Sequence, residues 1–279
     1  MKCFEITRLV LDDSHQALPG TDAQRKKLII ESMESMSDTY RNKLLKQGGP
    51  DFAAPEYRYA YVYTYVPAHA DWVCDLMSKD KAMKSLFKRE SVDVTCLGGG
   101  PGSDLVGILK YMEKIKSPAS LFCEIVDGCK EWKKTWGKLA KRINWPRAIH
   151  TDYVIHDAGD PTTWDDPNHF EEADLFSLSF FVSEIFSLEK HAREYLASSL
   201  SRAKKGAFLV MQDNNAASFY EMFDMVAKKT GFKVIFEDTQ PNMRVDSAEQ
   251  KSALGDHYTR LGRLPKLTGN IVRRIMVKE

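Results

Sequence analysis

The chain has 279 residues, 43% of them hydrophobic and 28% charged, which is ordinary for a globular protein. Its 40 basic and 39 acidic residues give a net charge of +1, so no overall charge attracts nucleic acid or an anionic membrane surface. No stretch approaches the roughly 20 apolar residues of a membrane span, and the first residues lack the apolar region of a signal peptide. We expect a protein of the cytoplasm, or of the nucleus, without a membrane partner.

The cysteines and histidines indicate neither a disulfide framework nor a metal centre. The five cysteines form no C-x-x-C pair, and their odd number favours reduced thiols. The seven histidines show no metal-binding spacing. We therefore expect no bound metal.

Residues 1–90 carry helical periodicity and are predicted to form an N-terminal cap. A long amphipathic helix is predicted from Ala23 to Lys46, because apolar residues recur there every three to four positions. Residues 47–51 read Gln-Gly-Gly-Pro-Asp, which is typical of a break between helices.

The tyrosine-rich segment after this break permits two interpretations. The alternation of tyrosines over residues 57–65 suits a strand with one aromatic face. A helix would instead place Tyr61, Tyr65 and His69 on one stripe, since they recur four residues apart. We favour the helix, with a kink at Pro67.

From residue 91 onward, strands and helices alternate, which is typical of a mainly parallel sheet covered by helices. The predicted strands are Val92–Leu97, Ser120–Val126, a strand around Tyr153–Ile155, Asp174–Phe181, Gly206–Met211, Phe232–Glu237 and Asn270–Val277. The predicted helices are Ser103–Lys116, Cys129–Arg142, Leu188–Arg202 and Ala217–Thr230. Residues 91–279 are thus expected to form one α/β domain behind the cap of residues 1–90.

A glycine-rich turn separates the first of these strands from its helix. Glycines occupy positions Gly98, Gly99, Gly100 and Gly102. Glycine lets the backbone turn tightly and approach a ligand closely, and the helix that follows presents free N–H groups to that ligand. The turn therefore predicts a site for a nucleoside-containing cofactor.

The glycine spacing is G-x-G-x-G, not the G-x-G-x-x-G of dinucleotide-binding proteins. It resembles motif I of the class I S-adenosylmethionine (SAM) dependent methyltransferases, and the resemblance covers roughly residues 91–279. This implies an α/β fold with a seven-stranded, mostly parallel Rossmann-like sheet, an antiparallel last strand and SAM as cofactor. One position departs from the family, because Cys96 stands where an acidic residue is usual. Asp104, just after the turn, is expected to take over part of that polar role.

The resemblance also assigns cofactor contacts to the ends of the second and third strands. Asp127, followed by Gly128, ends the second strand, where a carboxylate accepts hydrogen bonds from the ribose hydroxyls. Asp157 and Ala158 follow the third strand, where an acidic residue and the next backbone N–H hold the adenine. Asp160 is an alternative there, although Asp160-Pro161 more naturally begins a turn.

The fourth strand is expected to end beside the methyl group that is transferred. Ser179 and Phe180 are predicted to line the cleft there, and Glu184 is the candidate to orient or deprotonate a nucleophile. Asp213 and Asn214, after the fifth strand, are weaker candidates for the same cleft. This region lacks the Asn/Asp-Pro-Pro-Tyr/Phe motif of enzymes that methylate base amines and the Pro-Cys pair of RNA cytosine-C5 enzymes.

The cap is predicted to close over this cleft. An N-terminal cap with tyrosines resembles that of small-molecule N-methyltransferases of the class. Tyr61 is expected to contact the cofactor, and Tyr65 and His69 the substrate or its proton. Residues 239–267 look polar and irregular, and their basic residues are candidates for an anionic substrate or a protein partner. The basic and aromatic residues considered there are Arg244, His257, Tyr258, Arg260 and Arg263.

The predicted function is methyl transfer from SAM, by in-line displacement, to an N, O or S atom of a small molecule or a protein side chain. Alternatives are an RNA methyltransferase, a SAM-fold module that binds a partner without catalysis and, more weakly, an NAD-linked oxidoreductase. Nucleic acid is the less favoured partner, because the basic runs are short. The acceptor and the oligomeric state are not specified by the sequence.

Overall fold

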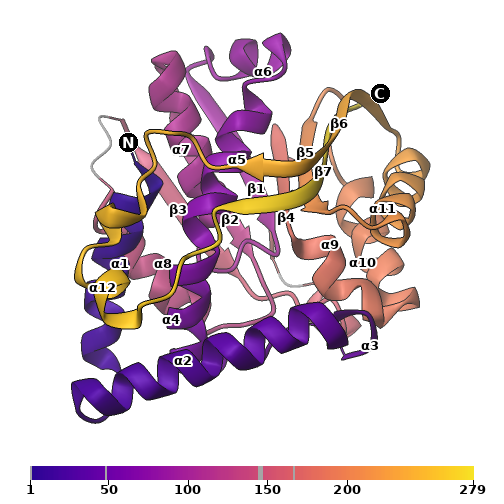
Figure 1. The fold of residues 1–279 in the computed structure, drawn as a ribbon. Coiled ribbons are helices and arrows are strands. Elements are labelled where there is room, and N and C mark those ends of the chain that lie inside the picture. The colour runs from indigo at the N-terminus through magenta and orange to yellow at the C-terminus, as the bar shows by residue number, and fades with distance from the viewer. Residues whose placement is uncertain (1, 48, 144–146, 166) are drawn as a thin grey trace.

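The computed structural model describes residues 2–47, 49–143, 147–165 and 167–279. Its centre is a seven-stranded sheet in the order β3-β2-β1-β4-β5-β7-β6, in which β1 to β5 are parallel and β7 runs antiparallel to both β5 and β6 (Figure 1). The predicted mostly parallel sheet is thus confirmed. The strands are β1 Ser91–Leu97, β2 Ser120–Val126, β3 Ile149–Val154, β4 Leu175–Ser179, β5 Phe208–Asn214, β6 Phe232–Arg244 and β7 Thr268–Lys278.

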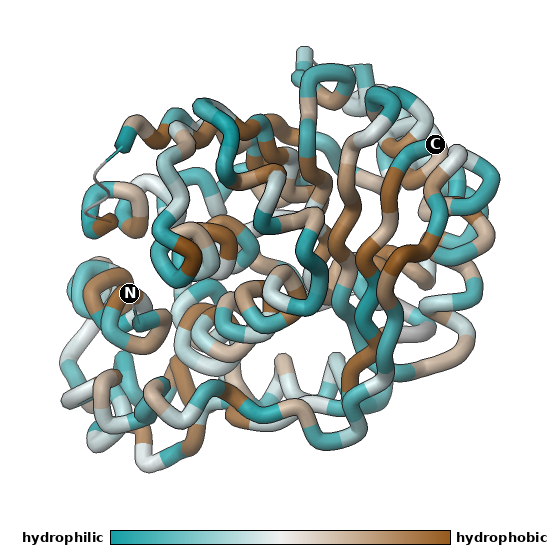
Figure 2. Tube along the Cα trace, turned by 90° about the horizontal axis from the view of Figure 1, so that it is seen from above, coloured by the Kyte–Doolittle hydropathy of each residue, from teal (hydrophilic) through white to brown (hydrophobic). Residues whose placement is uncertain are grey.

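Helices cover both faces of the sheet, and two apolar cores result. Val94 and Cys96 of β1 join a core with helix α7, whereas the next residue, Leu97, joins the core beneath α10 and α11. This follows from the alternation of side chains along a strand that is buried on both faces. Figure 2 shows the apolar residues gathered along the central strands. The helices of the sheet region are α7 Ser103–Ile115, α8 Trp132–Ala140, α9 Phe181–Ile185, α10 Lys190–Ser201, α11 Ala217–Lys229 and α12 Asp256–Leu261. Short 3-10 helices are η2 Pro161–Thr163, η3 Phe186–Leu188 and η4 Lys251–Leu254.

The described residues up to Leu86 form helices that pack on the sheet region. They are α1 Cys3–Ala17, α2 Asp22–Asp38, the π-helix η1 Thr39–Lys43, α3 Leu44–Gln47, α4 Pro55–Thr64, α5 Val66–Met77 and α6 Lys81–Leu86. Together α2, η1 and α3 form a long rod that crosses the molecule and ends near α9 and η3 (Figure 1). Helix α5 packs against α7 so closely that a Cβ on Gly107 would lie 2.4 Å from the Ala70 carbonyl oxygen. The division of the chain at residue 90 stays a prediction.

The tyrosine-rich segment is the helix α4, as predicted. The bend comes two residues earlier than expected, at Tyr65, whose φ is −117°. Pro67 is near the start of α5, where a helix does not need the missing N–H, so it begins a new helix and does not kink an old one.

An ion-pair cluster ties the start of the chain to α5 and α7. The Glu249 carboxylate accepts hydrogen bonds from the backbone N–H groups of Cys3 and Phe4 at 2.9 and 3.2 Å, which satisfies free donors at the start of α1. The Lys110 ammonium lies 2.5 Å from Glu249 and 2.6 Å from Asp71. Because Glu249 and Asp71 are buried, removing Lys110 would leave two uncompensated carboxylates inside the protein.

The two edge strands account for the main errors in the predicted elements. Strand β3 begins at Ile149 and not near Tyr153, and β6 continues to Arg244, so residues 239–244 are not irregular. Edge strands expose alternate side chains, so polar residues such as Asp152 interrupt the apolar pattern by which a strand is detected in the sequence. Strand β5 also runs on to Asn214, and α8 begins only at Trp132.

Across the described residues, no helix combines the length and the apolar character that a membrane crossing requires. All five cysteines are free thiols. Cys96 and Cys123 lie on neighbouring strands with their sulfur atoms 3.7 Å apart.

Candidate active site

The glycine-rich turn leaves β1 and enters α7 with a backbone that only glycine adopts readily. Gly98, Gly100 and Gly102 have φ values of +65°, +42° and +90°, all in the left-handed region. A Cβ on Gly98 would lie 2.1 Å from a ring carbon of Phe181, and one on Gly102 would lie 2.6 Å from Trp136. Packing against Phe181 and Trp136 therefore fixes the conformation of the turn.

Asp127 holds this turn from the end of β2. Its carboxylate accepts hydrogen bonds from the backbone N–H groups of Gly100 at 2.9 Å and Cys129 at 2.8 Å. Burial raises the pKa of Asp127 to about 6, and these hydrogen bonds oppose that shift. Each oxygen receives one of the two bonds, so each keeps one acceptor position for a ligand.

The loop after β3 lies against the same turn. The Asp157 carboxylate accepts from the Gly159 N–H at 2.8 Å, and the indole N–H of Trp164 donates to the Asp157 carbonyl at 2.7 Å. Gly128 faces this loop, since a Cβ on it would lie 3.3 Å from the Asp157 Cα. Among the described residues, nothing accepts a hydrogen bond from the Ala158 N–H.

These strand ends surround one cleft of about 260 Å³, which we call the glycine cleft. Phe52, Tyr61 and Trp132 cluster at it, with ring centroids 5.0 to 5.6 Å apart. The donor and acceptor pattern fits a nucleoside cofactor, because a carboxylate with spare acceptor positions and an unpartnered N–H face an aromatic-walled space. Predicted residues that line the glycine cleft are Gly98, Gly100, Asp127, Gly128, Asp157, Ala158 and Tyr61.

Five predicted cofactor residues do not line the glycine cleft: Gly99, Gly102, Asp104, Ser179 and Phe180, the last of which lines a neighbouring cavity. Asp104 is 1% exposed and accepts hydrogen bonds from the hydroxyl groups of Ser177 and Ser179, the latter at 2.8 Å. Asp104 and Ser179 thus join α7 to β4, and the expected polar role of Asp104 toward the cofactor stays a prediction that these hydrogen bonds do not support. Gly99 also lies outside the lining; a Cβ there would meet Cys96 and Ile125 at 2.9 Å. Cys96 itself is buried beside Cys123.

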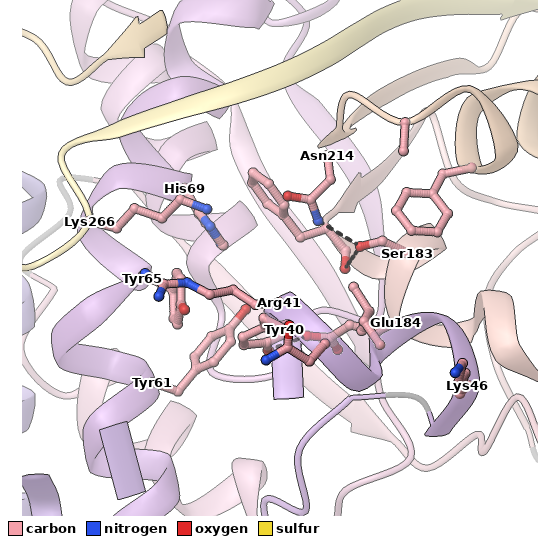
Figure 3. A pocket seen from close by; sticks show the side chains of 15 residues that line it. Tyr40, Arg41, Lys46, Tyr61, Tyr65, His69, Ser183, Glu184, Asn214 and Lys266 are labelled. Carbon is pink, nitrogen blue, oxygen red and sulfur yellow. Dashed lines mark hydrogen bonds between the residues drawn. The ribbon is translucent and has the colours of Figure 1, made fainter. Parts of the chain in front are cut away.

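A second cavity of about 370 Å³ adjoins the first, and we call it the tyrosine pocket (Figure 3). Tyr61 and Glu184 line both cavities, so they stand at the passage between them. The tyrosine pocket draws its walls from η1, α4, α5, α9 and the chain before β7. Its polar and aromatic lining includes Tyr40, Arg41, Tyr61, Tyr65, His69, Phe180, Ser183, Glu184, Asn214 and Lys266.

Glu184 is the most perturbed carboxyl group at this passage. It is on the short helix α9 and accepts a hydrogen bond from the Tyr40 hydroxyl at 2.6 Å. Burial raises the pKa of Glu184 to about 8, although the bond from Tyr40 lowers it. A carboxyl group with a pKa near neutrality is suited to proton transfer.

His69 and Phe180 form the inner wall of the tyrosine pocket. Their rings stack with centroids 3.8 Å apart and 14° between their planes. His69 is 2% exposed, and among the described residues neither of its ring nitrogens has a hydrogen-bond partner. Burial, helped by the nearby Lys266, lowers the pKa of His69, so the ring is neutral. Phe180 has a left-handed φ of +59°, a conformation that costs a non-glycine residue about 1–3 kcal/mol.

The sequence analysis missed Tyr40, Trp132 and Lys266. Tyr40 belongs to the apolar stripe of the predicted first helix, where it reads as a core residue. Of the basic residues expected to serve a ligand, His257 instead bonds Tyr59 at 2.6 Å. Arg263 pairs with Glu34.

The weaker candidates after β5 divide between two roles. Asn214, at the end of β5, lines the tyrosine pocket, and its amide donates to the Ser183 hydroxyl at 3.0 Å. Asp213 is 1% exposed and accepts from the Ser183 N–H at 3.0 Å, so it supports α9 from behind. Asp160 begins a turn, as expected, and accepts from the Thr162 N–H at 3.0 Å.

No protein-family model matches the chain, and no curated protein matches it. Some solved structures are similar to it. One is a SAM-dependent methyltransferase from Clostridium acetobutylicum, 10% identical over 75% of this chain and 92% of that chain, with a TM-score of 0.46. Another is an O-methyltransferase family protein from Burkholderia thailandensis, 14% identical over 91% of this chain and 72% of that chain, with a TM-score of 0.47. Identities and TM-scores this low bear on no substrate. The chain has the seven-stranded, mostly parallel sheet that its resemblance to the class I SAM-dependent methyltransferases implies.

Proposed function

We propose that this protein is a SAM-dependent methyltransferase that acts on a small molecule. The observation that carries the proposal is the glycine cleft, in which the turn after β1, Asp127 after β2 and Asp157-Ala158 after β3 meet at one edge of the sheet. Ligands of open α/β sheets bind outside the carboxyl ends of the strands. The adjoining tyrosine pocket then provides a separate space for the acceptor.

Each wall of the glycine cleft has its own role in this proposal. The spare acceptor positions of Asp127 receive the ribose hydroxyls, and the Asp157 carboxylate and Ala158 N–H hold the adenine edge. The left-handed glycines bring the backbone close to the ligand without side chains in the way. Phe52, Tyr61 and Trp132 exclude water from the passage.

When bound, SAM would supply an electrophilic methyl carbon on a sulfonium sulfur, with the thioether S-adenosylhomocysteine as the leaving group. The protein has little chemistry left to do beyond alignment, and alignment alone supplies up to roughly 7–11 kcal/mol of the barrier. Glu184 stands at the passage, where its carboxylate receives the proton that the nucleophile loses. Its raised pKa makes it a stronger base than an ordinary glutamate.

The test is isothermal calorimetry with S-adenosylhomocysteine (SAH) and NAD in parallel. We expect SAH to bind to the wild-type protein and NAD to leave no heat of binding. Binding of NAD alone would replace the proposal with a dehydrogenase, and binding of neither ligand would remove it.

Asp127→Asn locates the site. The amide keeps one acceptor oxygen but loses the charge, and charge-assisted hydrogen bonds are worth about 1.5–3 kcal/mol each, so we expect SAH to bind about 10- to 100-fold more weakly. The matched control is Asp165→Asn, an exposed acid outside the glycine cleft, which should bind SAH like the wild type. Equal affinity in both variants would show that the ribose site is elsewhere.

A further inference from the structure

We propose that the substrate of the tyrosine pocket is a small aromatic molecule that carries an anionic group, and that Lys266 binds this group. The inference rests on the proposed function only in calling the ligand a substrate. Its direct support is a cation that lies over two aromatic rings of the pocket and forms no ion pair with a carboxylate of the described residues. It names a ligand class and a specificity residue that the glycine cleft does not specify.

Lys266 is a cation held in the wall of the pocket. Its ammonium lies 5.3 Å from the ring centroid of Tyr65 and 5.4 Å from that of Phe180. No carboxylate of the described residues pairs with it, in contrast to Lys110, which has two. Burial lowers the pKa of Lys266, and the negative charge of Asp213 opposes that shift. Two aromatic faces compensate part of the cost of that burial, and an anionic ligand would compensate the rest.

The backbone fixes where Lys266 stands. Its N–H donates to the Thr64 carbonyl at 2.8 Å, which anchors the chain before β7 to the end of α4. In Figure 3 Lys266 and His69 lie on one side of the tyrosine pocket and Glu184 lies on the other. A ligand bound through its anionic group at Lys266 would thus extend toward Glu184 and the passage to the glycine cleft.

The other charged residues that line the tyrosine pocket also favour an anionic ligand. Arg41 and Lys46 also line the tyrosine pocket, and neither has an acid partner within the described residues. Among the described residues of the lining, Glu184 is the one carboxyl group, and the cations Arg41, Lys46 and Lys266 outnumber it even when it is ionised. The pocket therefore carries a net positive charge, which favours an anion over a neutral or cationic ligand.

The remaining walls describe the uncharged part of the ligand. Tyr40, Tyr65 and Phe219 present aromatic surface, and Leu44 and Ala216 add apolar surface. The unpartnered nitrogens of His69 offer one donor and one acceptor deep in the pocket. A volume of about 370 Å³ lies at the small end of the range for ligand pockets, which fits a ligand of one ring with an acidic group.

The test measures four probes on the full chain by protein-observed NMR titration: benzoate, phenyl phosphate, benzamide and benzylamine. We expect both anions to bind about tenfold more tightly than benzamide, and benzylamine to bind more weakly still. The tighter of the two anions identifies the acidic group as a carboxylate or a phosphate. Benzamide or benzylamine binding as tightly as both anions would overturn the proposal.

Two variants assign the anion site to Lys266. Lys266→Met should reduce benzoate affinity about tenfold and leave benzamide affinity unchanged. Lys84→Met, at an exposed lysine on α6, is the matched control and should bind both probes like the wild type. If Lys266→Met fails to fold, Arg41→Gln at the rim of the pocket should still weaken benzoate, by about twofold. Unchanged benzoate affinity in the folded variants would contradict the proposal.

Calorimetry with SAH on the same proteins separates this inference from the proposed function. Failure of SAH to bind wild-type protein, with benzoate still dependent on Lys266, would remove the methyltransferase and keep the anion site. A loss of SAH affinity in Lys266→Met, with benzoate unaffected, would show that Lys266 serves the cofactor, and the anionic substrate would be wrong.

Discussion

The two adjoining cavities differ in whether backbone groups or side chains line them. The glycine cleft is mostly backbone: left-handed glycines, an Ala158 N–H that donates to none of the described residues and a carboxylate that itself holds two backbone N–H groups. The tyrosine pocket is mostly side chains, and they come from helices before the sheet, from α9 and from the chain before β7. Backbone groups leave little room for substitution, whereas side chains can change one at a time. The glycine cleft is thus suited to a ligand that related proteins have in common, and the tyrosine pocket to a ligand that is particular to this protein.

The largest effect is expected from a substitution that disrupts the glycine cleft alone. In Gly98→Ala, the new Cβ would lie 2.1 Å from the Phe181 ring, and the residue would keep a left-handed φ of +65°. The turn must therefore shift. In an active site, a misplacement of about 1 Å is enough to lower the reaction rate about 100-fold. We expect SAH affinity, measured by calorimetry, to fall by at least that factor.

The control for this variant is Gly137→Ala in α8. Nothing lies within 4 Å of the position that its Cβ would occupy, so the change should leave SAH affinity unchanged. Because alanine stabilises a helix by about 1 kcal/mol relative to glycine, this variant should have a slightly higher free energy of unfolding than the wild type. Wild-type affinity in a folded Gly98→Ala protein would contradict the assignment of the cofactor to this turn.

The second prediction separates chemistry from cofactor binding at the passage. Glu184→Gln keeps the shape of the side chain and removes its basicity. Methyl transfer to the acceptor, once one is identified, should fall by about 10²- to 10⁴-fold, with SAH affinity unchanged. Single-turnover rates measure the first quantity and calorimetry the second. A wild-type rate in Glu184→Gln would mean that the acceptor reacts without a base from the protein.

The residues of the glycine cleft could be predicted to lie together because each of them follows a strand. The left-handed glycines come after β1, Asp127 after β2 and Asp157-Ala158 after β3, and parallel strands deliver their ends to the same edge of the sheet. The direction of Asp104 could not be predicted, because a sequence does not show which way an acid in the first turn of a helix points, and in the structure it accepts hydrogen bonds from Ser177 and Ser179.

The tyrosine pocket was predicted only in part. Tyr61, Tyr65 and His69 share one helical stripe, which periodicity reveals. Tyr40 and Glu184 are 144 positions apart, and no local pattern joins them. Lys266 follows a polar segment in which Arg263 and His257 pair with acids of the first helices, and only the tertiary fold distinguishes Lys266 from them.

The third prediction concerns the stability of the passage against pH. Between the ordinary pKa of glutamate, 4.5, and its value of about 8 in the folded protein, the folded state retains a proton on Glu184 that the unfolded state has lost. Stability contributed by this group therefore falls as pH rises through that window. The difference in unfolding free energy between wild type and Glu184→Gln should fall by up to about 1.4 kcal/mol per pH unit.

Urea denaturation at a series of pH values measures this difference. Taking the difference removes the contributions of Asp127 and Glu124, whose pKa values burial also raises, to about 6 and about 7. Parallel stability curves for the two proteins would contradict a raised pKa at Glu184.

The smallest expected effect tests whether η1 tunes the passage. The Tyr40 hydroxyl donates to Glu184 at 2.6 Å and stabilises its ionised form, so Tyr40→Phe should raise the pKa of Glu184 further. The pH window in which Glu184 lowers stability would then extend to more alkaline values. Tyr63→Phe is the matched control, because its hydroxyl also donates at 2.6 Å, but to the Arg263 carbonyl outside the tyrosine pocket. An equal alkaline shift in both variants would reflect a general loss of stability. A shift in Tyr40→Phe alone would show that a residue 144 positions from Glu184 sets its proton affinity, and that the side-chain-built cavity is tuned from the cap.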